Sequence, residues 1–189
     1  MITIMLAYAN CIYELRKEIA VMLLSFIYGL IGIVLLTAFC LIGAFSVPQI
    51  AYWMMTPYAV RLLEKAGIPR KLDTQSWIKI GVLTVLVGMG FVLTIITAGI
   101  QGVRAGMSFF ELSLRFVIFF WMVSLFDAIV LDWWMFTKTD IFGVLIKKKT
   151  GETPEAWRVD PQWDGKEMLK LIIEIVVSVI LAFVFIKIV

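Results

Sequence analysis

Three carboxylates lie inside long apolar runs of this chain, and they are the side chains there that could do chemistry. Asp127 and Asp132 belong to the third run and Glu174 to the last. A carboxylate in hydrocarbon costs about 2.5 to 3.5 kcal/mol on insertion scales, so each acid needs a partner, water or a proton. Neighbouring carboxylates in a low-dielectric setting tend to hold a proton, which can be exchanged for a cation. The acids therefore predict a proton or cation site.

The same acids also allow a purely structural interpretation. Asp127 can be a buried acid hydrogen-bonded to Ser124 or to a neighbouring helix, and Asp132 can be an interfacial anchor. Glu174 can be a simple i,i+4 partner of Lys170. Because Asp127 and Asp132 are five positions apart, they would lie about 140° apart on an α-helix, which disfavours a paired-carboxylate hydrolase. The structural and ion-binding interpretations both stay open.

The composition predicts a lipid environment. Of the 189 residues, 62% are hydrophobic and 16% are charged, which is more apolar surface than a soluble fold of this size can hide. The absence of histidine excludes His-ligated haem, His-dependent zinc sites and His-activated nucleophiles. Cys11 and Cys40 lack metal-binding spacing and are interpreted as packing residues. We expect no cofactor and no metal.

Four apolar segments predict an all-α fold, an integral membrane four-helix transmembrane bundle that forms a single domain over residues 1–189. The first segment stops at Pro48, which cannot continue a helix. Asp73 is available as N-cap of the second, and Ser108 and Glu111 form a capping box before the third. The predicted transmembrane helices cover residues 19–47, 74–99, 109–136 and 165–188.

The connections between these helices carry their own signals. A short interfacial helix is predicted between the first two spans, with Thr56 as N-cap and Gly67 as left-handed stop. Gly81 and Gly88 are one heptad apart, which predicts close helix contact. The glycine-rich residues 99–106 are interpreted as a tight turn, since they match no nucleotide motif.

The basic residues indicate which side each connection faces. Twelve of the 17 basic residues lie on the side of the first and third connections. By the positive-inside rule, these connections face the cytoplasm and both termini are extracytoplasmic. No basic cluster suggests a nucleic-acid partner. The five basic residues on the opposite side are Arg16, Lys17, Arg104, Arg115 and Lys187.

Counting inward from the cytoplasmic ends of the four predicted helices places several polar residues at similar depth. This predicts a polar layer in the cytoplasmic half of the bundle, with Lys79 and Lys170 as counter-charges at its rim. The layer would contain Thr37, Thr84, Ser124, Asp127, Glu174 and Ser178.

Three functions remain as alternatives. The first is a non-enzymatic membrane protein that works as a homo-oligomer or as an accessory subunit with other membrane proteins. The second is a proton- or cation-coupled transporter or channel that uses Asp127 and Glu174. The third is an enzyme acting on a lipid at the cytoplasmic interface, near Asp132 and the loop with Lys147, Lys148 and Lys149. These lysines could contact lipid headgroups, although they also serve as a topology signal.

The stretch from Phe126 to Trp133, with the sequence FDAIVLDW, is followed by a polar loop and a last apolar helix. This C-terminal third resembles small, uncharacterised bacterial four-helix membrane proteins. The resemblance implies the four-helix architecture and a bacterial inner membrane. It implies no activity for any residue.

Overall fold

A computed structural model describes residues 2–47, 49, 52, 61, 64, 67, 69–135 and 165–189, and the elements formed by these residues are helical. Four helices are long and apolar enough to cross a membrane, which confirms the expected helical architecture at this level. The interfacial helix falls largely outside the described residues, although Gly67 has the expected positive φ of 71°. The elements are α1 (Ile2–Ser46), α4 (Thr74–Arg104), α5 (Phe109–Phe126), its π-helical continuation η2 (Asp127–Met135) and α8 (Gly165–Ile188).

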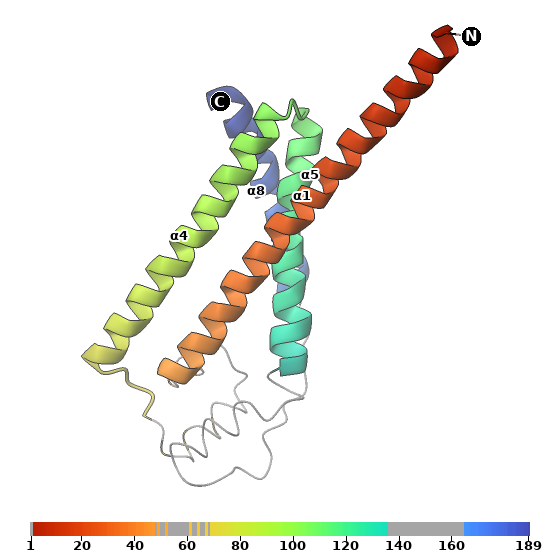
Figure 1. The fold of residues 1–189 in the computed structure, drawn as a ribbon. Helices are drawn as coiled ribbons and strands as arrows, with labels where there is room; N and C mark the ends of the chain where they lie inside the picture. Colours follow the sequence, from red (N-terminus) through yellow and green to blue (C-terminus); the bar gives the residue numbers. More distant parts are fainter. Residues whose placement is uncertain are drawn as a thin grey trace.

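The central helix of the bundle is α5, which packs against both α1 and α8. α4 packs mainly on α1 and makes smaller contacts with α8 and α5. Both termini lie toward the end of the bundle that carries the α4–α5 link, while α1 ends and α4 begins at the other end (Figure 1). The four helices therefore alternate in direction along the bundle, and because their number is even, both termini lie at the same end.

The first helix is much longer than expected. α1 begins at Ile2 rather than near residue 19 and has 45 residues, or about 68 Å at 1.5 Å per residue. Its N-terminal part projects past the α4–α5 link (Figure 1). The charged residues from Glu14 to Glu18 suggested the polar end of the helix, but Glu, Lys and Arg are good helix formers. The charges therefore limit the apolar span, which is Val21–Ser46, and not the helix.

α4 also continues further than predicted, to Arg104 instead of residue 99. Gly99 and Gly102 remain helical, and the turn is confined to Ala105 and Gly106, where Gly106 has a φ of 73°. Met107 N donates to Gly102 O at 3.1 Å and closes the link. The glycine-rich segment is therefore mostly helix with a two-residue turn at its end.

Both predicted helix starts are confirmed. Ser76 N donates to Asp73 Oδ1 at 2.8 Å, and the hydrogen bonds with Ser76 lower the pKa of Asp73. Before α5, Ser108 N donates to Glu111 Oε2 at 2.6 Å, while Glu111 N donates to Ser108 Oγ at 3.3 Å. These caps satisfy amides that have no partner within the helix.

Within α4, the glycines that make close contacts are not the ones that the sequence indicated. Within the described chain, Gly81 and Gly88 face open space, so the prediction of close packing there is wrong. Close approach occurs at Gly99, where an added Cβ would lie 2.6 Å from ring carbons of Phe185. At Gly102 an added Cβ would lie 2.6 Å from Leu112 Cδ1. α4 therefore uses its C-terminal glycines for packing.

The core lies where α4, α5 and α8 meet. Leu112, Phe116 and Ala182 are fully enclosed, and Phe185 stacks on Phe116 with ring centroids 5.7 Å apart. Outside this core, each candidate span exposes many large apolar side chains. Such continuous apolar surface is stable among acyl chains and unstable in water.

Candidate functional site

Four polar residues meet between α5 and α8. Ser124, in the last turn of α5, and Asp127, the first residue of η2, are three positions apart. Lys170 and Glu174 are four positions apart on α8. Each pair therefore shares one helix face. Because the two helices are antiparallel, the first residue of one pair faces the second residue of the other. We call Ser124, Asp127, Lys170 and Glu174 the α5–α8 acid cluster.

Two interactions join the α5–α8 acid cluster across the interface. Lys170 Nζ lies 3.5 Å from Asp127 Oδ2, and the Ser124 hydroxyl donates a hydrogen bond to Glu174 Oε1. Lys170 had been a candidate i,i+4 partner of Glu174, but the ion pair of Lys170 is with Asp127, while Glu174 accepts a hydrogen bond from α5. With all groups ionised, two carboxylates and one ammonium give these four residues a formal net charge of −1.

The cluster has a shallow and a deep half. The side chains of Lys170 and Asp127 are 41% and 29% exposed, and Lys170 is two positions from the start of the candidate span at Met168. Its long stem can therefore carry the ammonium toward the polar boundary. Glu174 lies one turn deeper beside buried Ser124, about 9 Å from the start of the span.

Neighbouring hydrogen bonds fix the helix pair around the cluster. Ser178 is fully buried, and its hydroxyl donates to Glu174 O at 2.7 Å. Trp121 Nε1 donates to Leu171 O at 3.2 Å and ties α5 to α8 one turn away. Ser178 and Ala182 are four positions apart on α8 and are both fully enclosed, and their small size allows close approach of a neighbouring helix.

The backbone changes at Asp127. The α-helix α5 ends at Phe126, and the π-helical segment η2 begins with Asp127. In a π-helix, hydrogen bonds from i to i+5 bring residues five positions apart close to one turn. The separation of 140° between Asp127 and Asp132 was predicted for an α-helix, and this prediction is wrong because the segment is π-helical. The side chain of Asp132 lies outside the described part of the structure.

The other predicted site residues lie elsewhere. Thr84 is exposed on α4, and the Thr37 hydroxyl donates within α1 to Ile33 O at 2.8 Å. Lys79 is exposed at the beginning of α4. The pKa of Asp73 is lowered mainly by hydrogen bonding with Ser76, and the positive charge of Lys79 lowers it further. The structure therefore gathers only the α5 and α8 members of the predicted layer. Lys147, Lys148 and Lys149 fall outside the described residues.

A second polar cluster surrounds Arg115, a residue that the sequence analysis counted only as a topology charge. Arg115 is 1% exposed and lies six positions inside the candidate span that begins at Phe109, about 9 Å along the helix. Its Nε donates to Ser25 Oγ at 3.2 Å, and its Nη1 donates to Gln101 Oε1 at 2.8 Å. Arg115 therefore links α5 to both α1 and α4.

Further contacts complete the Arg115 environment. Nη1 also donates to Ala98 O at 3.1 Å, and Nη2 donates to Val21 O at 3.4 Å. The guanidinium carbon lies 5.8 Å from the ring centroid of Tyr28, within range of a cation–π interaction. All the hydrogen-bond acceptors named here are neutral, so the guanidinium is stabilised by dipoles and a π face. The sequence contained one indication of this environment, because Arg115 lies inside the third apolar run and not at its edge.

Comparison with known protein families, with curated proteins and with solved structures found no match.

Proposed function

We propose that this chain is a multi-pass membrane protein that binds and releases a proton or small cation at the α5–α8 acid cluster, as a small transporter or channel. The observation that carries the proposal is the meeting of two carboxylates and one lysine at a single helix interface. Asp127 pairs with Lys170 at 3.5 Å, and Glu174 accepts from Ser124. Ionisable groups inside membrane spans commonly mark ion pathways and proton relays.

The charge balance of the cluster supports binding of a positive species. The two carboxylates and the one ammonium of these four residues sum to a formal charge of −1, and the helices that carry them are largely apolar. A proton on Glu174, or a cation shared by Glu174 and the Ser124 hydroxyl, would remove that charge. Release would restore it, at an electrostatic cost that depends on hydration from the nearby boundary.

The π-helical segment η2 supports a site that changes conformation. π-helical turns occur frequently at functional sites, because a shift in hydrogen-bond register needs only a small rotation of the helix. η2 begins at Asp127, the residue that pairs with α8. We infer that a change in protonation at the cluster alters the register of η2.

Proton flux into liposomes tests the proposal. Protein reconstituted with a pH-sensitive dye inside the vesicles is energised by a potassium diffusion potential. We expect wild-type flux above that of empty vesicles, loss of most flux in Glu174→Gln, and reduced flux in Asp127→Asn. Separate experiments with a sodium or a potassium gradient in place of the diffusion potential, and a dye for that ion inside the vesicles, identify the transported ion.

Thr84→Val provides the matched control, because Thr84 was predicted in the same layer but is exposed on α4. Its flux should equal that of wild type. Infrared difference spectra between pH 5 and pH 9 should show a protonated carboxyl band that Glu174→Gln removes. Wild-type flux equal to that of empty vesicles, or an unchanged band in Glu174→Gln, would refute the proposed site.

We further propose that the protein works as an oligomer or with other membrane subunits in a bacterial inner membrane. Four helices rarely enclose a pathway alone, and the α1 segment before Val21 projects beyond the bundle (Figure 1). The basic side then faces the cytoplasm, and both termini lie outside. Mass measurement in native nanodiscs should give a multiple of 21.5 kDa. A strictly monomeric mass without partners would contradict this assembly.

A further inference from the structure

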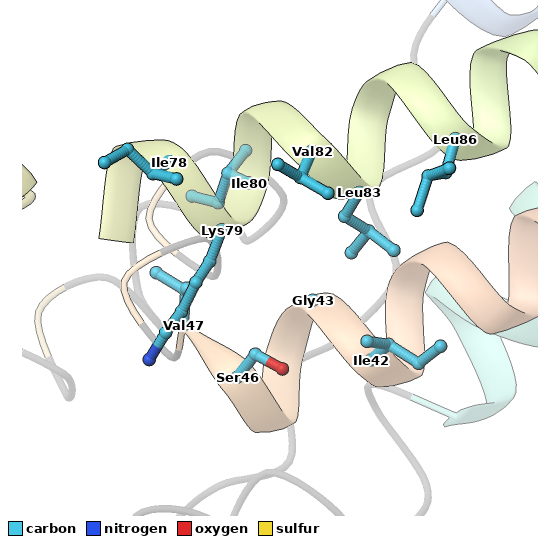
Figure 2. A pocket seen from close by; sticks show the side chains of 10 residues that line it. All are labelled: Ile42, Gly43, Ser46, Val47, Ile78, Lys79, Ile80, Val82, Leu83 and Leu86. Carbon is cyan, nitrogen blue, oxygen red and sulfur yellow. The ribbon is translucent and has the colours of Figure 1, made fainter. Parts of the chain in front are cut away.

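A pocket of about 340 Å³ lies between the C-terminal end of α1 and the first turns of α4. Figure 2 shows Ile42 on α1 facing Leu83 and Leu86 on α4 across this space. Its volume lies within the range of small-molecule sites in proteins. The pocket is at the opposite end of the apolar span Val21–Ser46 from Arg115's partner Val21, and its lining residues do not include the α5–α8 acid cluster.

The pocket has apolar walls and a polar rim. Its two polar side chains are Ser46, in the last turn of α1, and Lys79, near the start of α4. Figure 2 shows the Lys79 side chain leaving α4 and extending toward the end of α1 near Ser46 and Val47. A ligand that fits this distribution has a long apolar part and an anionic group at one end.

The chain that leads into α4, the helix that forms one wall of the pocket, carries more basic than acidic residues. Arg70 and Lys71 are exposed just before α4, and Trp77 is 55% exposed at the level where aromatic residues mark a membrane interface. The nearby Asp73 carboxylate is engaged as N-cap of α4. The described charged residues between 61 and 79 are four basic against two acidic, namely Arg61, Arg70, Lys71 and Lys79 against Glu64 and Asp73.

The pocket adjoins surface that lipid would cover. Val82 and Leu86 line it and are 54% and 62% exposed, and Val85 and Met89 continue the apolar surface along α4. A ligand diffusing within the bilayer therefore reaches the pocket laterally. A water-soluble ligand would have to cross an apolar surface instead.

We infer that this pocket binds an anionic phospholipid, with an acyl chain between α1 and α4 and the phosphate on Lys79 and the Ser46 hydroxyl. Charge complementarity selects an anionic lipid, because a zwitterionic headgroup brings its own cation to a site that is already positive. The inference rests on the proposed membrane insertion. It is independent of proton binding at Glu174, since the two sites share no residue.

Lipid titration followed by native mass spectrometry tests this site. Detergent-solubilised full-length protein is titrated with phosphatidylglycerol and, separately, with phosphatidylcholine carrying the same chains. We expect wild type to bind phosphatidylglycerol about fivefold more tightly than phosphatidylcholine, because one cation near an anionic headgroup contributes about 1 kcal/mol. Lys79→Gln should remove this preference and Lys79→Arg should retain it. Leu83→Trp, which fills the pocket, should weaken binding of both lipids.

Two control variants separate the pocket from general lipid contact. Lys187→Gln removes an exposed lysine at the other end of the bundle, and Val85→Trp introduces the same residue at an exposed position outside the pocket. Both should bind lipid as wild type does. Circular dichroism checks that Leu83→Trp is folded, and Lys79→Gln provides the test if it is not.

Several results would overturn the inference. Equal affinity of wild type for the two lipids would exclude headgroup selection, and unchanged binding in Lys79→Gln would exclude that lysine. Competition by inorganic phosphate as effective as that by the lipid would indicate a free-phosphate site. If Leu83→Trp lowered the oligomeric mass and left lipid binding intact, the pocket would be a contact between copies. Unchanged proton flux in Glu174→Gln, together with the expected lipid selectivity, would refute the proton site and support this lipid site.

Discussion

The Arg115 guanidinium donates a hydrogen bond to the Ser25 hydroxyl at 3.2 Å, although the two residues are 90 positions apart in the sequence. The contact joins the central helix α5 to α1 within a region that buries both side chains. Gln101 brings α4 to the same guanidinium. One side chain therefore holds three helices in register at the end of the bundle near the α4–α5 link.

Removing this guanidinium should destabilise the bundle. We expect Arg115→Met to lower the free energy of unfolding by about 1.5 to 3 kcal/mol, the usual value of hydrogen bonds to a charged group. Arg115→Lys should lose less, because it keeps the charge but lacks the planar fork. Thermal unfolding in detergent measures both. In a double-mutant cycle with Ser25→Ala, strictly additive losses would show that the two residues are not coupled.

The two groups of glycines in α4 should respond in opposite directions to alanine. Gly99→Ala places a methyl group 2.6 Å from the Phe185 ring, and such overpacking costs about 1 to 3 kcal/mol. Gly88→Ala is the matched control, since nothing in the described chain lies within 4 Å of the added carbon. It should raise helix stability by up to about 1 kcal/mol. Destabilisation by Gly88→Ala would reveal a contact with another copy or partner.

Removing one partner of the Asp127–Lys170 pair should lower stability by more than the attraction between the two charges contributes, because one charged side chain then remains without the other. Both side chains are partly exposed, so the pair itself contributes little, roughly 0 to 1 kcal/mol. Lys170→Met leaves the Asp127 carboxylate without its cation. We expect this variant to be less stable than the double variant Lys170→Met with Asp127→Asn, which removes both charges. Equal melting temperatures would show that lipid-side hydration already compensates Asp127.

The start of α4 should weaken in acid. Hydrogen bonding with Ser76 is the main cause of the lowered pKa of Asp73. The ionised carboxylate therefore stabilises the folded protein fully at pH values above 3.8, the ordinary pKa of this group. The effect is lost as the pH falls through the lower folded value. Asp73→Asn keeps a good N-cap without a titrating group. Melting curves from pH 6 to pH 2.5 should show a steeper loss for wild type than for Asp73→Asn, and parallel curves would contradict this role.

The sequence determined the helices and their caps, because these depend on residues close together in the chain. Apolar length alone identified four spans, and the last was predicted with its observed bounds, 165–188. The capping box of Ser108 and Glu111 was readable because its partners are three positions apart. The predicted start of the first helix was wrong, because the charged segment from Glu14 to Glu18 continues the helix instead of ending it.

Only the tertiary structure decided which helix faces meet. The spans are apolar all round, so the sequence contains no stripe to show which side faces protein and which faces lipid. Depth along the helix axis placed Asp127 and Glu174 at a common level, but depth could not show that Thr84 points away. Nor could it show that Arg115 is enclosed by Ser25 and Gln101. These outcomes depend on helix rotation and partner choice, which are set by contacts between residues far apart in the chain.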